Sequence, residues 1–496
     1  MKVHLMYRDK DFDKEFRVTS NEQILIQDLE LDTLFDAMAN GDKIIWEAVR
    51  KAFFESLVNA DEILYRQDVL KDCIENPDAI KTLYAIVTTA IEKKRESWWG
   101  ISSMYLSSIL GSSVSLLQMF MEALRKIRTV VDKQHEKFHS EGFTTLFSMI
   151  KRELDDDYLS AVENHLKELK FRSGILISAE LGSYNQGIHY VLRSDKNKKH
   201  RWLRWKFAPS FTLPPRDDSG CTDLSKREDR AINLAANALA QSAGHVLSFF
   251  MMLQAELAFY VGCLNLYERL FEKGEPVAFP LPHSCRERMF SVKGLYDASL
   301  ALILKDRAVG NYINADNKDL VIITGANQGG KSTFLRSVGQ AQLMMQCGMF
   351  TAAEFFSANI CDGIFTHYKK EEDSSMRSGK LDEELVRMND IVNNIRTNAL
   401  ILFNESFSST NEREGSEIGR QIVHALLEKH IKVFFVSHLY DFSHGFYEKR
   451  SENMLFLRAE RHSNGHRTFQ LVEGEPLQTS FGEDIYYKIF KSNIKG

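Results

Sequence analysis

The sequence contains little proline, and its few prolines are clustered. Only 8 of the 496 residues are Pro, and none lies between Pro77 and Pro209 or between Pro215 and Pro276. Because proline ends or kinks a helix, these two spans allow unusually long helices. The segment Gly274-Glu275-Pro276 ends the second span and predicts the main boundary in the chain.

The sequence also lacks paired cysteines and a strong net charge. Its six cysteines are scattered, without a Cys-x-x-Cys pair or a His cluster at metal-ligand spacing. This pattern predicts a reduced, cytoplasmic protein without structural zinc. The net charge of −5 gives no general attraction for nucleic acid, so contact with DNA would need a local basic patch. The charged N-terminus lacks the apolar core of a secretion signal.

Two long stretches with little charge are long enough to span a membrane, but neither is typical of a membrane span. Residues 97–121 contain eight serines, and their apolar side chains follow one helical stripe. The run Val246–Leu266 carries Glu256 at its centre. Both stretches therefore predict buried helices of a bundle, and we expect no membrane partner.

The spacing of apolar residues predicts a helical N-terminal region and a C-terminal α/β region. Residues 20–170 and 224–271 follow helical periodicity, whereas strand and helix patterns alternate after residue 276. Two short β-like runs, Ile175–Ala179 and Ile188–Leu192, form a small insertion between the helical stretches.

A dense basic run with two tryptophans follows the second β-like run. Such a segment can neutralise phosphates and stack on bases, which would make it a DNA contact. It can equally be a solvated hairpin whose tryptophans pack inward, and the sequence leaves both interpretations open. The residues concerned are Lys198, Lys199, Arg201, Trp202, Arg204 and Lys206.

A glycine-rich segment after the apolar run Leu320–Ile323 predicts a P-loop. Its glycines let backbone amides approach phosphate oxygens, Lys331 brings a positive charge to the phosphates, and Ser332 offers a hydroxyl to Mg²⁺. The helix that starts there points its positive dipole end at the nucleotide. The predicted nucleotide-binding residues are Gly325, Ala326, Asn327, Gln328, Gly329, Gly330, Lys331, Ser332 and Thr333.

Two later strands end in residues suited to ATP hydrolysis. The apolar strand Ala399–Phe403 ends in Asn404-Glu405, and P-loop enzymes have a strand beside the P-loop that ends in residues that hold Mg²⁺ and orient water. The strand Val433–Val436 ends in Ser437-His438, where a His can sense the γ-phosphate. These patterns predict Glu405, His438 and Lys331 as catalytic residues, and Ser332, Asn404 and Glu405 as metal ligands.

Ser378 precedes a predicted helix between the P-loop and Glu405. A serine there is commonly an N-cap, but in ATPases that bind nucleotide between two subunits, a serine in this chain order reaches the partner's γ-phosphate. Together these residues resemble the ATPase domain of the MutS family of DNA mismatch-repair proteins, of the ABC class. The matching residues are Thr324–Arg336, Asp362–Thr366, Ser378, Glu383, Asn404, Glu405, Thr410, Ser437 and His438, with Leu31–Phe35 and Tyr65–Gln67 similar to the family's helical core.

The resemblance implies a multidomain protein in which a mainly α-helical core, lever and clamp region precedes an α/β ABC-type P-loop ATPase domain. The implied segments are 1–170 (helical core and lever), 171–220 (small β insertion with the basic run), 221–284 (long helical segment) and 285–496 (ATPase domain). It implies ATP and Mg²⁺ as cofactors, a homodimer, and mismatched, branched or duplex DNA with further repair proteins as partners. We expect a short form without an N-terminal mismatch-recognition domain, so Phe446-Tyr447-Glu448 is a chance match to the mismatch-reading Phe-x-Glu.

Two departures from the family pattern affect the expected activity. Asn404 replaces an Asp, which keeps an oxygen near the metal but loses its charge, and Ser406-Phe407-Ser408-Ser409 replaces a loop containing Gly-Arg-Gly. The main hypothesis is an ATPase that clamps DNA in repair or recombination. The alternative is a nucleotide-gated dimeric scaffold with little hydrolysis, and a third candidate, a transporter subunit, is disfavoured by the helical region before the ATPase.

Overall fold

The structure, a computed structural model, describes the chain except residues 13–20, 99–105, 172–173, 194–208, 215, 371–378, 463–464, 479–482 and 484–496. It divides into two compact units that interleave along the sequence. The first comprises Met1–Val3, Asp78–His139 and Phe143–Leu257. The second comprises His4–Pro77, Ser140–Gly142 and Ala258–Gly496. The boundaries of the four segments drawn from the sequence stay a prediction.

The first unit is mainly helical and has one two-stranded sheet. Its elements are α5 (Pro77–Trp98), α6 (Leu106–Gln134), η1 (His135–Lys137), α7 (Glu141–Glu153), α8 (Asp156–Glu168), β1 (Ile177–Leu181), η2 (Ser183–Asn185), β2 (Gly187–Leu192) and most of α10 (Asp218–Glu272). The strands β1 and β2 pair antiparallel, which confirms the two β-like runs seen in the sequence.

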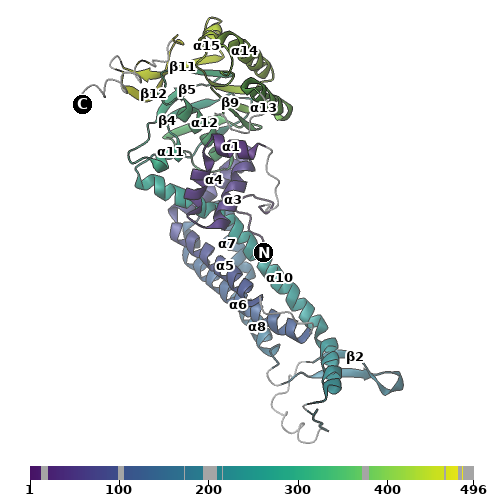
Figure 1. Cartoon of the computed structure of the whole chain (residues 1–496). Helices are drawn as coiled ribbons and strands as arrows, with labels where there is room; N and C mark the ends of the chain where they lie inside the picture. The colour runs from purple at the N-terminus through teal and green to yellow at the C-terminus, as the bar shows by residue number, and fades with distance from the viewer. Residues whose placement is uncertain are drawn as a thin grey trace, which may run out of the picture. The chain divides into compact units, whose positions relative to one another are not determined.

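Helices α5, α6 and α10 run side by side in this unit (Figure 1). Phe120 of α6 meets Phe250 of α10 edge to face, with ring centroids 5.2 Å apart. Gln254 of α10 donates a hydrogen bond to the Thr88 hydroxyl of α5 at 3.0 Å. These contacts explain why a long proline-free stretch with a regular apolar stripe becomes a single helix of 55 residues.

One described helix, α10, is long and apolar enough to cross a membrane by length and composition. However, 72% of its most apolar window is buried inside the protein, and Glu256 within it is fully buried. A core helix of a folded domain has these properties, as the central glutamate suggests.

The second unit combines N-terminal helices with two sheets. Its helices are α1 (Glu22–Asp28), α2 (Leu31–Ala39), α3 (Lys43–Phe54), α4 (Ala60–Glu75), the end of α10, α11 (Ala298–Ile303), α12 (Lys331–Gln346), α13 (Lys380–Asn394), α14 (Glu412–Glu428) and α15 (Tyr440–Tyr447). Its strands are β3 (Leu281–His283), β4 (Phe290–Leu295), β5 (Asn311–Asn314), β6 (Leu320–Gly325), β7 (Phe355–Asn359), β8 (Ile364–Tyr368), β9 (Leu400–Asn404), β10 (Lys432–Val436), β11 (Met454–Arg461) and β12 (Arg467–Glu473).

The larger sheet has the strand order β12-β11-β6-β10-β9-β8, and the smaller has the order β3-β7-β4-β5. All neighbours in the larger sheet are parallel except β11 and β12. Because β10 lies between β6 and β9, the strand that ends at Asn404 is not the immediate neighbour of β6. Apolar runs identify buried strands, but strand order depends on how the crossover helices pack.

Both faces of the larger sheet are covered, as in α/β proteins with parallel sheets. One face of β6, β9 and β10 packs with α13, α14 and α15 in a single buried cluster, and these three helices are grouped together in Figure 1. On the other face α12 comes so close that a Cβ added at Gly339 would lie 2.9 Å from Leu402. The ends of β6, β9 and β10 are thereby held in fixed relation.

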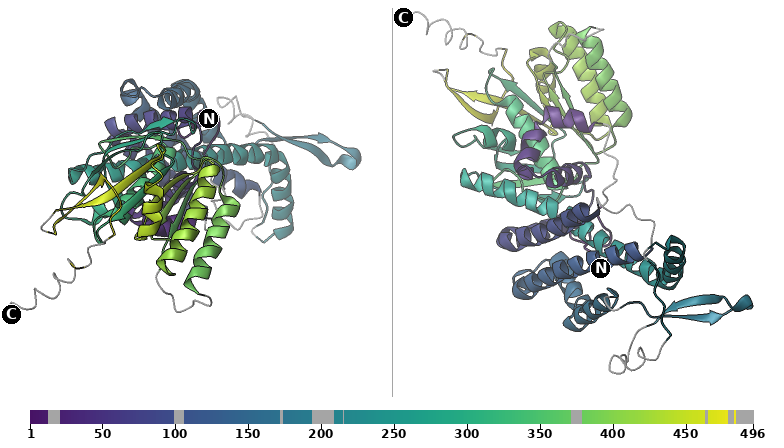
Figure 2. Two further views of the ribbon diagram at one scale, coloured as in Figure 1. Left: turned by 90° about the horizontal axis from the view of Figure 1, so that it is seen from above. Right: turned by 60° about the horizontal axis from the view of Figure 1, so that its bottom comes forward.

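The N-terminal helices α1, α2 and α3 lie beside the sheets of this unit, in purple in Figure 2. The Asn21 side chain donates a hydrogen bond to the carbonyl oxygen of Ile364 in β8 at 2.8 Å. Gln340 of α12 donates to the carbonyl oxygen of Leu29 at 2.9 Å. Residues far apart in the sequence thus build one compact unit around the glycine-rich segment.

Candidate nucleotide site

The glycine-rich segment forms the turn between β6 and α12. The strand β6 is fully buried between β10 and β11, so its carboxyl end has a fixed position. Gly325 and Gly330 have φ values of +108° and +90°. A Cβ at Gly325 would lie 2.8 Å from the backbone nitrogen of Ala459. Glycine is therefore required at both positions for the backbone to turn into the helix.

Lys331 is the first residue of α12, and its ammonium group lies over the turn. Its Nζ donates hydrogen bonds to the carbonyl oxygens of Gly325 and Ala326, at 3.0 and 2.9 Å. Burial lowers the pKa of Lys331 to about 8, although the nearby Glu405 carboxylate acts to raise it. The lysine charge and the free amides at the start of α12 therefore face the same region, which suits an anion such as phosphate.

Ser332 and Asn404 meet although they come from different elements. The Ser332 hydroxyl donates a hydrogen bond to Asn404 Oδ1 at 2.9 Å, from the start of α12 to the end of β9. The interposed strand β10 does not prevent this contact. Two neutral oxygens lie together here, beside the Glu405 carboxylate that follows Asn404 in the chain.

Glu405 is paired with His438. Its Oε1 lies 2.6 Å from His438 Nε2, and its backbone N–H donates to the carbonyl oxygen of Val436 at 2.9 Å. The bond to His438 lowers the pKa of Glu405, against an opposing effect of burial, and the charges of Lys331 and Lys369 add to the lowering. The carboxylate is therefore ionised near neutral pH and can accept a hydrogen bond from water.

The structure brings most of the predicted site residues together around one pocket of about 370 Å³. The carbonyl oxygens of Gly325 and Ala326 accept hydrogen bonds from the Lys331 ammonium group. The Asn404 side chain contacts Ser332, which lines the pocket. Ser378 and the basic-run residues Lys198, Lys199, Arg201, Trp202, Arg204 and Lys206 lie outside the described residues. The residues that line the pocket are Asn327, Gln328, Gly329, Gly330, Lys331, Ser332, Thr333, Glu405 and His438.

The residues present fit Mg²⁺ as a partner of a bound nucleotide. Magnesium prefers oxygen ligands and usually keeps several waters and phosphate oxygens. The Ser332 hydroxyl and the Asn404 amide oxygen supply two neighbouring oxygens. Within the described part of the chain no group of three or more His, Cys, Asp or Glu side chains could hold a metal ion. Phosphate oxygens and water would therefore have to complete the coordination.

A second, mainly apolar pocket of about 460 Å³ adjoins the first and shares Gln328, Gly330 and Thr333 with it. Its walls include Tyr296 and Leu300 before the turn in sequence, and Phe334 and Phe469 after it. Except for Phe334, none of these four was recognised from the sequence. They come from separate elements with no common pattern, so only the tertiary fold could reveal them.

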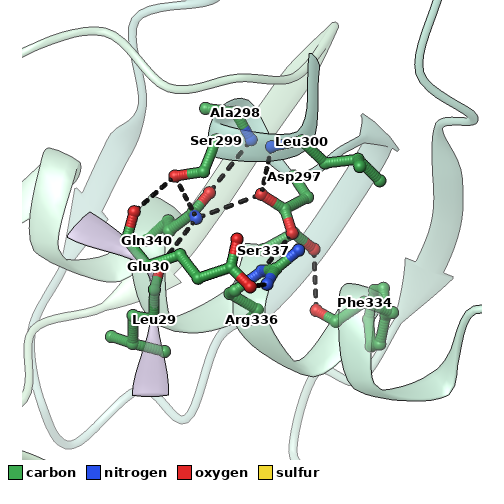
Figure 3. A network of polar contacts seen from close by, with 10 residues as sticks. All are labelled: Leu29, Glu30, Asp297, Ala298, Ser299, Leu300, Phe334, Arg336, Ser337 and Gln340. Carbon is green, nitrogen blue, oxygen red and sulfur yellow. Dashed lines mark hydrogen bonds and ion pairs between the residues drawn. The ribbon is translucent and has the colours of Figure 1, made fainter. Parts of the chain in front are cut away.

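A polar network fixes the wall of this second pocket to α12 (Figure 3). Asp297, whose side chain is fully buried, is paired with Arg336 of α12, and Arg336 is also paired with Glu30. Asp297 caps α11 by accepting the N–H of Leu300 at 3.0 Å. These contacts therefore tie the wall of the pocket to α12 and to the N-terminal segment.

Gln340, one turn after Arg336, joins the same three parts of the unit (Figure 3). Its amide nitrogen lies 3.1 Å from Asp297 Oδ1 and 3.0 Å from the Ser299 hydroxyl. Its amide oxygen accepts the N–H of Ala298 at 3.0 Å. Because all these groups are buried, losing one partner would leave others unsatisfied.

Comparison with known families finds one match in each half of the chain. Residues 58–273 match the family described as the MutS2 N-terminal domain, and residues 321–489 match the family described as MutS domain V. The glycine-rich turn and the Glu405–His438 pair both lie within the second match. The two matches together cover most of the chain.

Similar curated proteins include two DNA mismatch repair proteins and one MutS protein homolog. The DNA mismatch repair protein MSH3 of Arabidopsis thaliana is 31% identical over 37% of this chain and 18% of the relative. The DNA mismatch repair protein MutS of Porphyromonas gingivalis is 31% identical over 26% of this chain and 15% of the relative. MutS protein homolog 4 of Mus musculus is 30% identical over 31% of this chain and 16% of the relative. The chain thus matches less than a fifth of the length of these relatives.

Proposed function

The chain belongs to the MutS family, and we propose that it is a DNA-binding ATPase that couples ATP binding and hydrolysis to clamping on mismatched or otherwise structured DNA. The observation that carries this proposal is the meeting of Lys331, the Ser332–Asn404 pair and the Glu405–His438 pair at one pocket. Phosphate binding, metal binding and water activation need these groups within a few ångströms of each other.

Each residue has a distinct role in this proposal. Lys331 and the first backbone amides of α12 bind the phosphates. The apolar second pocket receives the nucleobase of ATP. Ser332 and Asn404 hold Mg²⁺, which when bound neutralises charge on the phosphates. Glu405 orients the attacking water as a base. His438, bonded to Glu405 at 2.6 Å, senses the γ-phosphate.

The proposed assembly is a dimer in which Ser378 acts at the partner's nucleotide. DNA and repair proteins are the proposed partners, and a cytoplasmic location stays a prediction. Binding to homoduplex, mismatch and junction DNA, with and without ATP and at several salt concentrations, tests the DNA part. A shallow salt dependence without preference for any structure would contradict it, because phosphate contacts release counterions.

The decisive test of hydrolysis is Glu405→Ala. We expect this variant to bind ATP but not to hydrolyse it. The attacking water would have no general base, while Lys331 and Ser332 could still bind the phosphates and Mg²⁺. Steady-state phosphate release and binding of radiolabelled ATP measure the two properties. Glu428→Ala, at an exposed glutamate of α14, is the control. Equal turnover in Glu405→Ala and wild type would refute the assignment.

The alternative proposal is a nucleotide-gated dimeric scaffold with little or no hydrolysis. It is favoured by the uncharged Asn404 beside Ser332 and by Ser406-Phe407-Ser408-Ser409 after Glu405. A steady-state ATPase assay separates the two proposals. Robust turnover stimulated by DNA would exclude the scaffold, whereas ATP binding without turnover would favour it.

A further inference from the structure

The loop after Glu405 has a backbone conformation that its residues do not favour. Glu405 and Phe407 have φ values of 56° and 61°, in the left-handed region that is uncommon for residues other than glycine. A bulky residue keeps such a conformation only when its surroundings impose it. The contacts of this loop should therefore identify what holds Glu405 in place.

Glu384 of α13 makes two of these contacts from a buried position. Glu384 is only 3% exposed to solvent. One carboxylate oxygen accepts the backbone N–H of Phe407 at 2.7 Å, and the other accepts the Ser409 hydroxyl at 2.8 Å. A buried carboxylate is costly unless it is hydrogen-bonded, and both donors here come from the loop.

His367 of β8 supports the same loop from the other side. Its Nδ1 lies 2.7 Å from the Ser406 hydroxyl, and its Nε2 lies 3.0 Å from the carbonyl oxygen of Glu384. Burial lowers the pKa of His367 to about 4, so the ring is neutral near pH 7. Since Nε2 faces the carbonyl oxygen of Glu384, it carries the hydrogen and donates, while the Ser406 hydroxyl donates to the carbonyl oxygen of His367 itself at 2.6 Å. The ring also stacks on Phe407 with centroids 5.3 Å apart.

These contacts lead directly to the proposed catalytic base. Phe407 is fully buried, and the Ser408 hydroxyl donates to the carbonyl oxygen of Glu405 at 2.7 Å. A Cβ at Gly415 of α14 would lie 2.2 Å from the carbonyl oxygen of Phe407, so the loop is also confined on this side. Moving the N–H of Phe407 would thus shift Glu405 relative to His438.

We propose that Glu384 is a positioning residue for hydrolysis, which holds the loop after β9 in the backbone conformation that keeps Glu405 beside His438. This inference rests on the proposed function, because it concerns the step that Glu405 performs. Glu384 does not touch the nucleotide pocket, whose lining residues do not include it. Its loss should therefore affect turnover more than nucleotide binding.

The test compares Glu384→Ala, Glu384→Gln and Ser409→Ala with wild type in the full chain. We expect Glu384→Ala to lower kcat about tenfold or more, since misplacing a catalytic group by an ångström costs up to ~100-fold. The Kd for a fluorescent non-hydrolysable ATP analogue should change less than about threefold. Glu384→Gln should restore most turnover, because its amide can accept from Phe407 and donate to Ser409. Asp382→Asn, exposed on the same helix, is the control.

The outcomes separate this inference from the proposed function. A wild-type protein without turnover would refute the proposed hydrolysis. An active wild type with equally active Glu384→Ala would refute only the role of Glu384, as would a parallel loss of kcat and affinity. Thermal melting shows whether each variant is folded. If Glu384→Ala does not fold, Ser409→Ala decides: a fall in kcat of about threefold supports the proposal, and unchanged kcat overturns it.

Discussion

Lys331 combines a positive charge with a largely buried position. Its pKa is lowered to about 8 by burial, so the ammonium is mostly charged at pH 7 and mostly neutral at pH 9. Phosphate binds the charged form and raises this pKa, so proton loss competes with nucleotide binding. We expect the apparent Kd for an ATP analogue to rise about tenfold from pH 7 to pH 9.

The control for this pH dependence is Lys331→Arg. Because arginine stays charged across this range, the variant should show a flatter dependence of Kd on pH, whatever its absolute affinity. Fluorescence titrations at half-unit pH steps measure both proteins. Parallel profiles for the two proteins would show that another group is responsible.

Asn404 places a neutral amide at a position where the resemblance to the MutS family implies a carboxylate. Since Asn404 Oδ1 lies 2.9 Å from the Ser332 hydroxyl, Asn404→Asp would add a negative charge beside the proposed metal ligands. We expect the Mg²⁺ concentration for half-maximal ATPase activity to fall about tenfold, because Mg²⁺ favours charged oxygen ligands. Asn393→Asp, at an exposed position of α13, controls for net charge. An unchanged Mg²⁺ dependence in Asn404→Asp would contradict this role.

At the scale of elements, α12 anchors the wall of the apolar pocket through Asp297 and Arg336. Removing one partner of a buried ion pair typically costs about 3–5 kcal/mol. Arg336 is slightly exposed, so we expect Asp297→Ala to lower the free energy of unfolding by about 3 kcal/mol. The variant should also weaken nucleotide binding, since α11 loses its N-cap and Leu300 of this helix lines the pocket.

Urea unfolding and nucleotide titration measure the two effects of Asp297→Ala. Asp306→Ala serves as the matched control for the unfolding measurement, because Asp306 lies in the same wall but is exposed. A loss of less than about 1 kcal/mol would fit an exposed pair rather than a buried one. That result would contradict the anchoring role of Asp297.

The elements of the candidate nucleotide site were largely predictable from local sequence. The apolar runs Leu320–Ile323, Ala399–Phe403 and Val433–Val436 predicted β6, β9 and β10 because buried parallel strands are continuously apolar. The long helix from about Leu224 to Phe271 became α10 for a similar reason: one apolar stripe without proline. Local pattern therefore identified which segments carry the site.

The arrangement of these elements was not predictable from the same patterns. Nothing local indicates that β10 separates β6 from β9, or that Asp297 and Glu30 both pair with Arg336. The left-handed conformation of Phe407 is equally hidden, since the partner of its N–H is Glu384 on α13, which is distant in the sequence. These features depend on tertiary contacts, and they include the residues we propose as positioning groups.

At the scale of the whole molecule, the boundary between the two compact units falls within the sequence of α10. Residues of α10 up to Leu257 belong to one unit, and residues from Ala258 belong to the other. At its end, the Lys273 ammonium donates to the carbonyl oxygens of Ala301, Leu302 and Leu304, at 2.9, 2.9 and 2.6 Å. The helix thus ends on α11, in the wall of the pocket next to the glycine-rich turn.

The proposed dimer makes a prediction about mixtures of two inactive variants. Lys331→Ala removes a residue of the chain's own site, whereas Ser378→Ala removes a group proposed to act on the partner's nucleotide. Each variant alone should lack turnover. In an equal mixture, half of the dimers contain both variants, and each of these has one intact site of two. Phosphate release should therefore recover to about a quarter of the wild-type rate, given random exchange of symmetric subunits.

Lys331→Ala mixed with Glu405→Ala is the control, because both changes fall in the same chain's half-site and no mixed dimer regains an intact site. Recovery in this control, or none in the Ser378 mixture, would refute the composite site.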